Sequence, residues 1–349
     1  MRARLAEVLA MREDHQEELL QTIARASLSR WGISDDCSLR LISHSENAVF
    51  LITGEDGYRK VLRVHRTGYH SLNGVRSELT WMKALQEDVG VETPQAIAGL
   101  DGEMIQFVQL ETGHESRMVV LFEFITGEEP KSDDLIQAFY QLGSIAAKMH
   151  AHARAWARPS YFERLIWDYE RSLGAYPNWG GWQAGFADNK PGLEIVEAAN
   201  ALMRKRLAAF GTDSQDFGLI HSDLRLANLL VEGGGTKVLD FDDCGLGWYV
   251  YDIASSMTFI ENHSDAEAII ASWIEGYRTV GTLSEREIVE IPTFMMLRRL
   301  IIMGWAGSHP GTDLAREMGD EYTVGTVEFA QKYLDRSARF SEQEIIFHA

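Results

Sequence analysis

One short region of the chain strongly constrains its fold, because two apolar runs there bring carboxylate and amide side chains to one place. Asp223 and Asn228 precede the run at residues 229–231, and Asp240 follows the run at residues 237–239. Three consecutive glycines separate the runs, which predicts a tight turn and a β-hairpin. Such a hairpin places Asn228 and Asp240 at the same end. Three oxygen-bearing side chains there suit a magnesium ion and a general base; the alternative is a hairpin with solvated acidic turns.

The order of these residues matches a known catalytic motif. The chain contains, in sequence, His221-Ser222-Asp223, Asn228, Leu239-Asp240 and Tyr251-Asp252-Ile253-Ala254. This series resembles the catalytic loop and metal-binding Asp of protein-kinase-like phosphotransferases. It is more similar still to the aminoglycoside phosphotransferase and choline kinase family. Ser222 stands where that family usually has Gly, which is a small-for-small change.

The resemblance implies an α+β, two-lobed protein-kinase-like fold, with a small β-rich N-terminal lobe and a larger, mostly helical C-terminal lobe. We expect an N-terminal helical extension at residues 1–34, which packs on the first lobe. A small nucleotide-binding lobe is expected at residues 35–126. The large catalytic and substrate-binding lobe is expected at residues 127–349, and the family pattern covers roughly residues 35–310.

The same resemblance assigns the chemistry. Asp223 is expected to orient the acceptor hydroxyl and take its proton, and Arg225 to neutralise the transferring phosphate. Asn228 and Asp240 are expected to hold Mg²⁺. Asp252 is expected to anchor the catalytic loop rather than to touch substrate. His221 is expected to brace the loop through hydrogen bonds rather than to take part in the chemistry.

Residues of the expected small lobe are assigned to the nucleotide. Short strands are predicted between residues 38 and 65, followed by a helix at residues 71–85. The residues that the resemblance assigns to ATP are Ser43, Ser45 and Asn47 in the first loop, Arg63 on the third strand, and Glu78 on the helix, as the partner of Arg63. The alternatives are an ordinary hairpin loop, a strand Arg that reaches solvent and a solvated helix Glu.

The apolar run at residues 119–127 sits where a kinase-like fold has its hinge. In such folds the hinge backbone reads the edge of the adenine. The main chain of Glu123, Phe124 and Ile125 is therefore expected to contact ATP.

Two further groups of residues allow two interpretations each. Trp167, Trp179 and Trp182 lie in a segment where the family builds substrate contacts, so they either cage the substrate through their ring faces or form part of the core. Arg298 and Arg299 either reach the active site and bind an anionic acceptor group or pair with surface acids. We expect the pairing with surface acids.

The length of the segment that follows Asp240 indicates the substrate class. About a dozen residues separate Asp240 from the helix expected near Tyr251, and no Ala-Pro-Glu motif follows. This leaves no room for the long segment on which eukaryotic-type protein kinases dock peptides. We therefore expect ATP-dependent transfer to a hydroxyl of a small molecule: an amino alcohol, hydroxy-amino acid, sugar or aminoglycoside. A bacterial Ser/Thr protein kinase of the same fold and a non-catalytic nucleotide-binding module are the alternatives.

Composition limits the partners. The 349 residues carry a net charge of −19, which argues against nucleic acid and against an anionic membrane surface. The two cysteines, far apart in sequence, form no disulfide framework or metal motif. The first residues do not resemble a signal peptide, and no run of eighteen apolar residues occurs. We expect a cytoplasmic protein; the sequence does not predict its oligomeric state.

Overall fold

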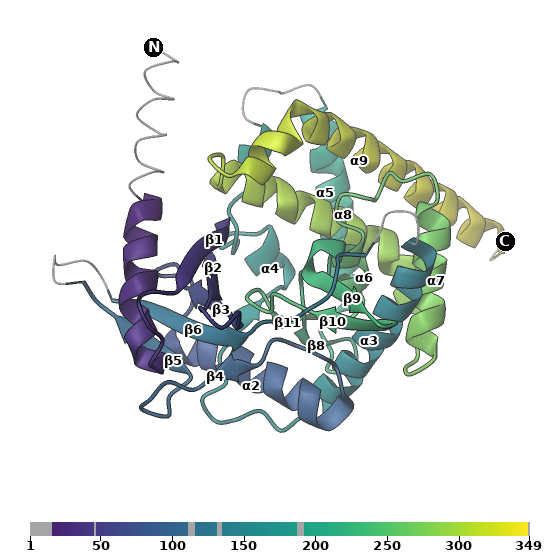
Figure 1. Ribbon diagram of the computed structural model, residues 1–349. Helices are drawn as coiled ribbons and strands as arrows, with labels where there is room; N and C mark the ends of the chain where they lie inside the picture. The colour runs from purple at the N-terminus through teal and green to yellow at the C-terminus, as the bar shows by residue number, and fades with distance from the viewer. Residues whose placement is uncertain (1–15, 45–46, 111–115, 131–134, 187–191, 348–349) are drawn as a thin grey trace, which may run out of the picture. The chain divides into compact units, whose positions relative to one another are not determined.

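The computed structural model describes residues 16–44, 47–110, 116–130, 135–186 and 192–347 (Figure 1). The chain divides into two compact units. Unit 1 contains the described residues up to Ala84, Thr93–Thr126 and Pro159–Glu163. Unit 2 contains Leu85–Glu92, Gly127–Arg158 and the described residues from Arg164 onward. Most of the helix content lies in unit 2.

Unit 1 is built on an antiparallel sheet of six strands. The strands run in the order β1-β2-β3-β6-β4, and β5 also pairs with β6. Their bounds are β1 (Ser38–His44), β2 (Ala48–Thr53), β3 (Arg59–Val64), β4 (Ala96–Ile97), β5 (Ile105–Val108) and β6 (Arg117–Glu123). The predicted succession of three short strands before residue 66 is therefore confirmed.

Alternation of apolar side chains gives this sheet a buried face. Along β2, Ala48, Phe50 and Ile52 are buried and the residues between them are only partly so. Leu20 and Ile23, from the helix at residues 16–27, belong to the same core cluster. The described part of the N-terminal helical region thus packs on the sheet as expected, whereas residues 1–15 lie outside the described part of the chain.

Unit 2 is mostly helical. Its longer helices are α3 (Leu135–Ala155), α5 (Leu193–Phe210), α7 (Ala266–Arg278), α8 (Glu285–Ser308) and α9 (Asp313–Phe347), with the short α4 (Tyr169–Ser172) and α6 (Tyr251–Ser256) between them. A three-stranded sheet joins β7 (Leu165–Ile166), β11 (Gly245–Trp248) and β8 (Phe217–Ile220). Helix α2 (Leu72–Val89) continues from unit 1 into unit 2. None of the helices within the described ranges has the length and apolarity needed to cross a membrane.

The predicted hairpin is present in unit 2. Strands β9 (Leu229–Glu232) and β10 (Gly235–Val238) are antiparallel, with Leu229 opposite Val238. Gly233 and Gly234 form the turn with φ of 59° and 84°, which are values of the left-handed region that a two-residue hairpin turn requires. The short 3-10 helix η3 (Leu226–Asn228) leads directly into β9. The glycine turn thereby fixes the end of the hairpin at which Asn228 and Asp240 lie.

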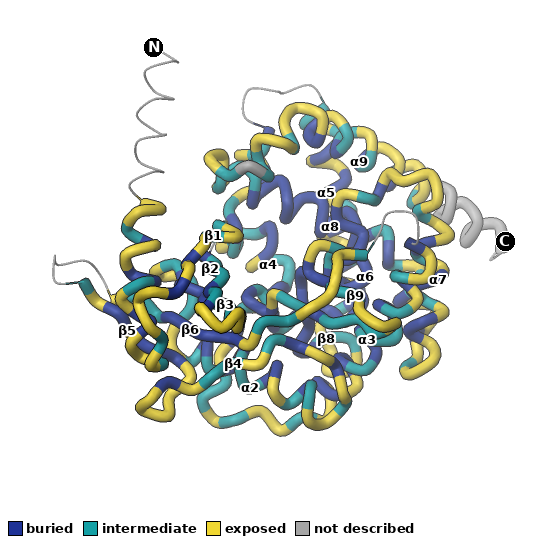
Figure 2. The backbone as a smooth tube through the Cα atoms, in the orientation of Figure 1, coloured by how far each residue is buried: buried dark blue, intermediate teal, exposed yellow. Residues whose placement is uncertain are grey.

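Helix α8 is buried on all sides over most of its length, as its dark blue tube shows in Figure 2. Every residue from Thr293 to Trp305 is buried, including Arg298 and Arg299. Ser284 caps its first turn, since its side chain accepts from the Glu287 N–H while the Glu287 carboxylate accepts from the Ser284 N–H. A helix that is buried all round needs an internal partner for each charged side chain.

Helices α3 and α7 cross at two glycines. The two helices lie side by side in Figure 1. A Cβ atom on Gly143 of α3 would lie 2.0 Å from the Trp273 carbonyl oxygen, and one on Gly276 of α7 would lie 1.8 Å from the Tyr140 carbonyl oxygen. Backbone atoms cannot move aside cheaply, so each helix needs glycine at the contact.

We therefore expect Gly143→Ala to lower the free energy of unfolding by about 3 kcal/mol, because the added methyl group overpacks the crossing. Gly74→Ala in α2 is the matched control, because its nearest neighbour atom would lie at 3.4 Å. The control should gain about 1 kcal/mol from helix propensity. Urea unfolding of both variants measures the difference, and equal effects would contradict the close crossing.

Candidate active site

The catalytic loop runs from β8 to η3 and is held by one buried carboxylate. Oδ1 of Asp252 accepts from the Ser222 N–H at 2.8 Å, and Oδ2 accepts from the His221 N–H at 3.1 Å. Nε2 of His150, on α3, lies 2.9 Å from the same Oδ2. Asp252 itself has no exposed surface. The predicted anchor role of Asp252 is therefore confirmed, and His150 is a buried partner of that anchor.

Backbone conformation in the loop explains the small residue at position 222. Ser222 has a φ of 73°, in the left-handed region that favours glycine. Its carbonyl oxygen accepts from Arg298 at 3.2 Å. The Ser222 hydroxyl is buried and has no hydrogen-bond partner among the described residues. Glycine, which the family usually has here, would remove both the strain and the unpaired hydroxyl.

His221 braces the loop as a neutral ring. Its Nε2 donates to the Leu239 carbonyl oxygen at 2.9 Å, and its Nδ1 accepts from the Asp223 N–H at 3.3 Å. A carbonyl can only accept and an N–H can only donate, so these bonds fix the Nε2–H tautomer. Burial lowers the pKa of His221, which outweighs the opposing effect of the nearby Asp252 and Asp223 carboxylates. The predicted bracing role is confirmed.

The carboxylate of Asp223 lies at the centre of this arrangement. Its Oδ1 pairs with the guanidinium of Arg298, and its Oδ2 accepts from Asn228 Nδ2 at 2.8 Å and from Arg225 Nε at 3.2 Å. Burial alone would raise the pKa of Asp223, but the charges of Arg298 and Arg225 outweigh it and hold the pKa well below its usual range. Asp223 is therefore ionised and fixed on both oxygens.

Arg298 is the principal functional candidate that the sequence analysis placed wrongly. We expected it to pair with surface acids, but it is 1% exposed and pairs with the buried Asp223. Arg299 does pair with an acid, Glu261 at 3.2 Å, yet both side chains are buried rather than on the surface. The two arginines interrupt the long apolar run of α8. That run was the available signal, because an all-apolar helix buries whatever charge it carries.

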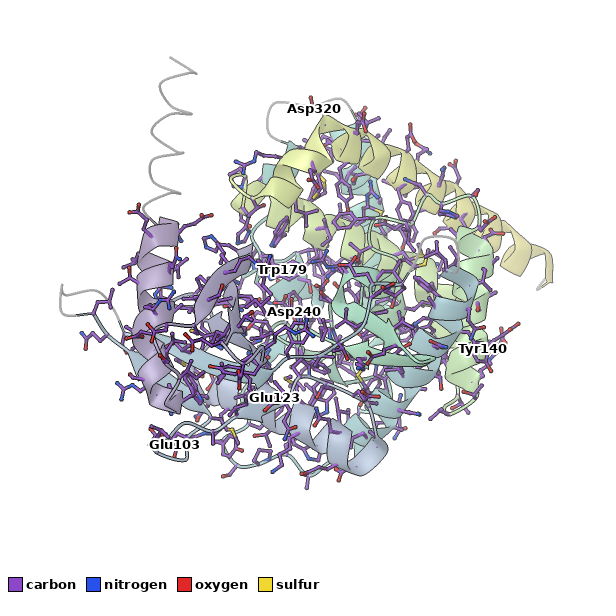
Figure 3. The ribbon with its side chains drawn as sticks, in the orientation of Figure 1. Glu103, Glu123, Tyr140, Trp179, Asp240 and Asp320 are labelled. Atoms are coloured by element: carbon purple, nitrogen blue, oxygen red, sulfur yellow. The ribbon has the colours of Figure 1, made fainter. Side chains whose placement is uncertain are left out.

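The hairpin brings the two predicted metal ligands together. The Leu239 N–H donates to the Asn228 carbonyl oxygen at 2.8 Å, so the residue before Asp240 lies opposite Asn228. Asp240, labelled in Figure 3, is exposed and has a φ of 56°. The Asn228 amide nitrogen donates to the main-chain oxygen and to Oδ2 of Asp223, both at 2.8 Å.

These contacts leave the Asn228 amide oxygen as the atom suited to a cation. An amide oxygen and a carboxylate are hard donors of the kind Mg²⁺ prefers, so the donor set fits that ion. Over the described ranges, no group of three or more His, Cys, Asp or Glu side chains could hold a metal. A two-residue site of this kind suits a metal that takes its other ligands from phosphate and water.

Unit 1 contains a second predicted pair. Arg63 on β3 and Glu78 on α2 form a two-pronged ion pair, with contacts of 2.8 and 2.9 Å. Glu78 is fully buried and Arg63 is 7% exposed, with its guanidinium 5.1 Å from the centre of the Phe122 ring. The predicted pairing is confirmed, and the alternatives of a solvated Glu and an Arg that reaches solvent are wrong.

Ser43 and Asn47, two of the remaining predicted nucleotide contacts, lie near the end of β1 and the start of β2. Ser43 is exposed on β1, and the Asn47 side chain is turned toward its own sheet, where it accepts from the Arg66 N–H at 3.1 Å. Ser45 lies outside the described residues. The Glu123 N–H donates to the Gln95 carbonyl oxygen at 2.9 Å, so this main-chain donor is already used within the sheet region.

The two residues after Glu123 follow the end of β6. Phe124 and Ile125 are half-buried. The Phe124 ring lies 3.8 Å from the Arg59 guanidinium carbon, and the Glu123 carboxylate pairs with Lys60. The side chains of Glu123 and Phe124 thus contact residues of the neighbouring strand β3.

The three tryptophans are core residues. Trp167, Trp179 and Trp182 are at most 7% exposed, and Trp167 meets Trp179 edge-on with ring centres 5.2 Å apart. Of the two interpretations, the core is supported and the exposed aromatic cage is not. Trp179, labelled in Figure 3, has a further contact, because the Arg298 guanidinium lies 5.5 Å from its ring centre.

These features define a class of protein. In unit 1, a strand Arg pairs with a helix Glu. In unit 2, a His-Ser-Asp loop adjoins a hairpin that carries an Asn and an Asp. Both features are typical of a protein-kinase-like phosphotransferase. The model of the phosphotransferase enzyme family that includes the aminoglycoside phosphotransferases matches residues 38–286. The chain belongs to that family, and it is a kinase-type phosphotransferase with the α+β, kinase-like fold that the sequence predicted.

Relatives with known activities agree with this assignment. The structure of a microcompartment-associated aminopropanol kinase is 36% identical, over 90% of this chain and 98% of that one, with a TM-score of 0.83. Amicoumacin kinase of Bacillus subtilis (strain 168) is 24% identical over 90% of this chain and 89% of its own length.

Two further matches extend the comparison. The amicoumacin kinase hAmiN, solved in complex with AMP-PNP, Ca²⁺ and Ami, is 20% identical over 90% of this chain and 93% of that one, with a TM-score of 0.73. The Ser/Thr protein kinase RdoA of Salmonella typhimurium is 23% identical over 80% of both chains. The hAmiN structure thus holds an ATP analogue together with a divalent metal ion.

We expect Ser222→Gly to raise the free energy of unfolding by about 1 kcal/mol. Glycine removes the strain of the left-handed conformation, and this gain exceeds the loss that comes from the greater conformational entropy of glycine in the unfolded chain. Ser222→Ala removes the same hydroxyl but keeps the Cβ atom, and so isolates the backbone effect. Thermal and urea unfolding should rank the glycine variant above the alanine variant. The reverse order would contradict a strained loop.

Proposed function

We propose that the protein transfers the γ-phosphoryl group of ATP to a hydroxyl of a small molecule, with small amino alcohols as the first acceptor class. One observation carries the chemistry: the ionised Asp223 carboxylate is fixed between Arg298, Arg225 and the Asn228 amide. The acceptor class is supported by the likeness to an aminopropanol kinase at 36% identity over 90% of the chain.

In the proposed reaction, Asp223 accepts a hydrogen bond from the acceptor hydroxyl and receives its proton as the new O–P bond forms. The bond between the γ-phosphorus and the ADP oxygen breaks in the same step, and ADP leaves with the electron pair. The low pKa of Asp223 makes it a weak base in the resting state. Its main contribution is then orientation of the hydroxyl, with proton uptake late in the transfer.

Arg225 is proposed to neutralise the transferring phosphate. Its side chain is 29% exposed and contacts Asp223 at 3.2 Å. A partly exposed guanidinium beside the base can turn to a phosphate without unpacking the core. Its movement would at the same time free a lone pair of Oδ2 for the acceptor hydroxyl.

Asn228 and Asp240 are proposed to hold Mg²⁺ through the amide oxygen and the carboxylate. When bound, the ion would neutralise charge on the nucleotide phosphates. In unit 1, the Arg63–Glu78 pair supports a role for Arg63 at the α- and β-phosphates, because Glu78 fixes the fork of the guanidinium. Ser43, Ser45 and Asn47 are proposed as phosphate contacts.

The remaining proposals concern the hinge and the organisation of the chain. The main chain of Glu123, Phe124 and Ile125 is proposed to contact the adenine. We keep residues 35–126 as the nucleotide-binding lobe, residues 127–349 as the catalytic lobe and residues 1–34 as the extension. We also propose a cytoplasmic protein without nucleic-acid partners, in line with two free, buried cysteines and a net charge of −19.

A protein acceptor is the second candidate, favoured by the 23% identity to a Ser/Thr protein kinase. The short stretch between Asp240 and α6, which begins at Tyr251, favours the small molecule. A panel of amino alcohols, hydroxy-amino acids, sugars and aminoglycosides, assayed for ADP release with Mg²⁺, separates the two. Turnover on an amino alcohol supports the proposal. Phosphorylation of a protein substrate with no turnover on the panel would replace it.

We expect Asp223→Asn to lower kcat by about 10²–10⁴-fold, because the proton acceptor and its charge are lost. ATP binding, measured by calorimetry, should survive. The melting temperature should also fall, since the buried Arg298 loses its counter-ion. A folded Asp223→Asn variant with wild-type kcat would remove Asp223 from the reaction.

Asp240→Ala should abolish the Mg²⁺-dependent part of ATP binding, because only one protein ligand for the metal remains. Glu232→Ala removes an equal charge from the other end of the same hairpin, where Glu232 pairs with Lys237 at 2.8 Å, and should leave ATP binding unchanged. Calorimetric titration of ATP with and without Mg²⁺ compares the two variants. Equal affinities would exclude Asp240 as a metal ligand.

A further inference from the structure

The two oxygens of the Asp223 carboxylate have different surroundings. Oδ1 faces Arg298, whose side chain is 1% exposed. Oδ2 faces the Asn228 amide and Arg225, whose side chain is 29% exposed. Solvent, and any acceptor, therefore approach from the Oδ2 side. The buried side is closed by the arginine.

Arg298 is itself held by side chains from several elements. Its Nε donates to Thr258 Oγ1 at 2.9 Å, beyond the end of α6, and its Nη1 donates to the Ser222 carbonyl oxygen at 3.2 Å. A longer contact of 3.4 Å reaches the Tyr251 hydroxyl, and the Trp179 ring lies 5.5 Å away. The guanidinium is planar and its donors point in fixed directions. These partners therefore fix the direction in which Arg298 Nη2 donates to Asp223.

We infer that Arg298 is a positioning residue, which holds Oδ1 of Asp223 so that Oδ2 is the oxygen presented to the acceptor hydroxyl. This inference deepens the proposed function and rests on it. Arg298 acts through Asp223, and its own contact with acceptor or nucleotide is not part of the role proposed for it. Without the hydrogen bond from Arg298, the Asp223 carboxylate can rotate. The acceptor hydroxyl is then held in poorer geometry for phosphoryl transfer.

Arg299 provides a matched comparison. It is the next residue of α8 and equally buried, at 3% exposure. Its partners are Glu261 at 3.2 Å, Thr326 Oγ1 at 3.0 Å and the Tyr322 carbonyl oxygen at 3.1 Å. None of these belongs to the catalytic loop. A change at Arg299 therefore tests the general cost of disturbing a buried guanidinium in this helix.

The experiment compares Arg298→Lys with Arg299→Lys, in full-length protein with the acceptor found by the panel. Lysine keeps the charge but loses the fork, so it cannot hold Asp223, Ser222 and Thr258 at once. We expect Arg298→Lys to lower kcat by about 10²-fold while KM for ATP stays unchanged. Arg298→Met should lower kcat further, and lysine should thus recover part of the loss. Arg299→Lys should lower the melting temperature and leave kcat unchanged.

Thr258→Val keeps the test decisive if Arg298→Met fails to fold. This change removes the acceptor for Arg298 Nε and the hydroxyl that donates to the Ser255 carbonyl oxygen, while every atom of Arg298 is kept. It should lower kcat, by less than Arg298→Lys does, with KM for ATP unchanged. Wild-type kcat in both folded Arg298→Lys and Thr258→Val would overturn the inference. Equal losses of kcat in Arg298→Lys and Arg299→Lys would also overturn it, because the effect would then be general.

A crystal structure of Arg298→Lys separates this inference from the proposed function. Rotation of the Asp223 carboxylate relative to the wild type supports positioning by Arg298, whether or not any acceptor turns over. An unchanged carboxylate contradicts it, even if the wild type phosphorylates an amino alcohol. Absence of turnover on every alcohol would count against the proposed function alone.

Discussion

The buried ion pair between Asp223 and Arg298 is the constraint on which the rest of the site depends. Removing two charges from water costs several kcal/mol per ion, and their mutual attraction offsets this cost only when other hydrogen bonds satisfy the remaining atoms. Here the Asn228 amide, Arg225, Thr258 and the Ser222 carbonyl supply those bonds. These bonds connect the catalytic loop, the end of the hairpin and the middle of α8. If any one of the three moved alone, a buried charge would lose a partner.

A second buried carboxylate supports the first. Asp252 accepts from two consecutive N–H groups of the loop, at 3.1 and 2.8 Å, and α3 contributes His150 to the same carboxylate. Since α3 packs on α7 through Gly143 and Gly276, the loop is connected to the helical core of unit 2. Such connection keeps a reactive side chain within the small tolerance that positioning catalysis requires. Ser222 has a φ of 73°, and in this left-handed conformation its carbonyl oxygen accepts from Arg298.

Patterns of residues close together in the sequence predicted much of the candidate site. The glycine turn and its two flanking apolar runs specified the hairpin, and the spacing from His221 to Asn228 specified the loop, because each depends on residues close in sequence. The Arg63–Glu78 pair, fifteen residues apart, followed from the resemblance to kinases. Arg298 could not be assigned, because it lies 75 residues from Asp223 and its partner depends on how α8 packs. The burial of Trp179 and the use of the Glu123 N–H by Gln95 depend on tertiary packing in the same way.

In the proposed reaction, the phosphoryl group of ATP goes to an alcohol oxygen of a small molecule. Phosphorus NMR of a reaction mixture of the protein, ATP, Mg²⁺ and an amino alcohol such as aminopropanol measures the fate of that group directly. We expect a phosphate monoester signal, with carbon-bound protons coupled to the phosphorus, that grows as ATP declines and is absent with Asp223→Asn. Loss of ATP to inorganic phosphate alone, or no loss of ATP with any alcohol of the panel, would contradict it.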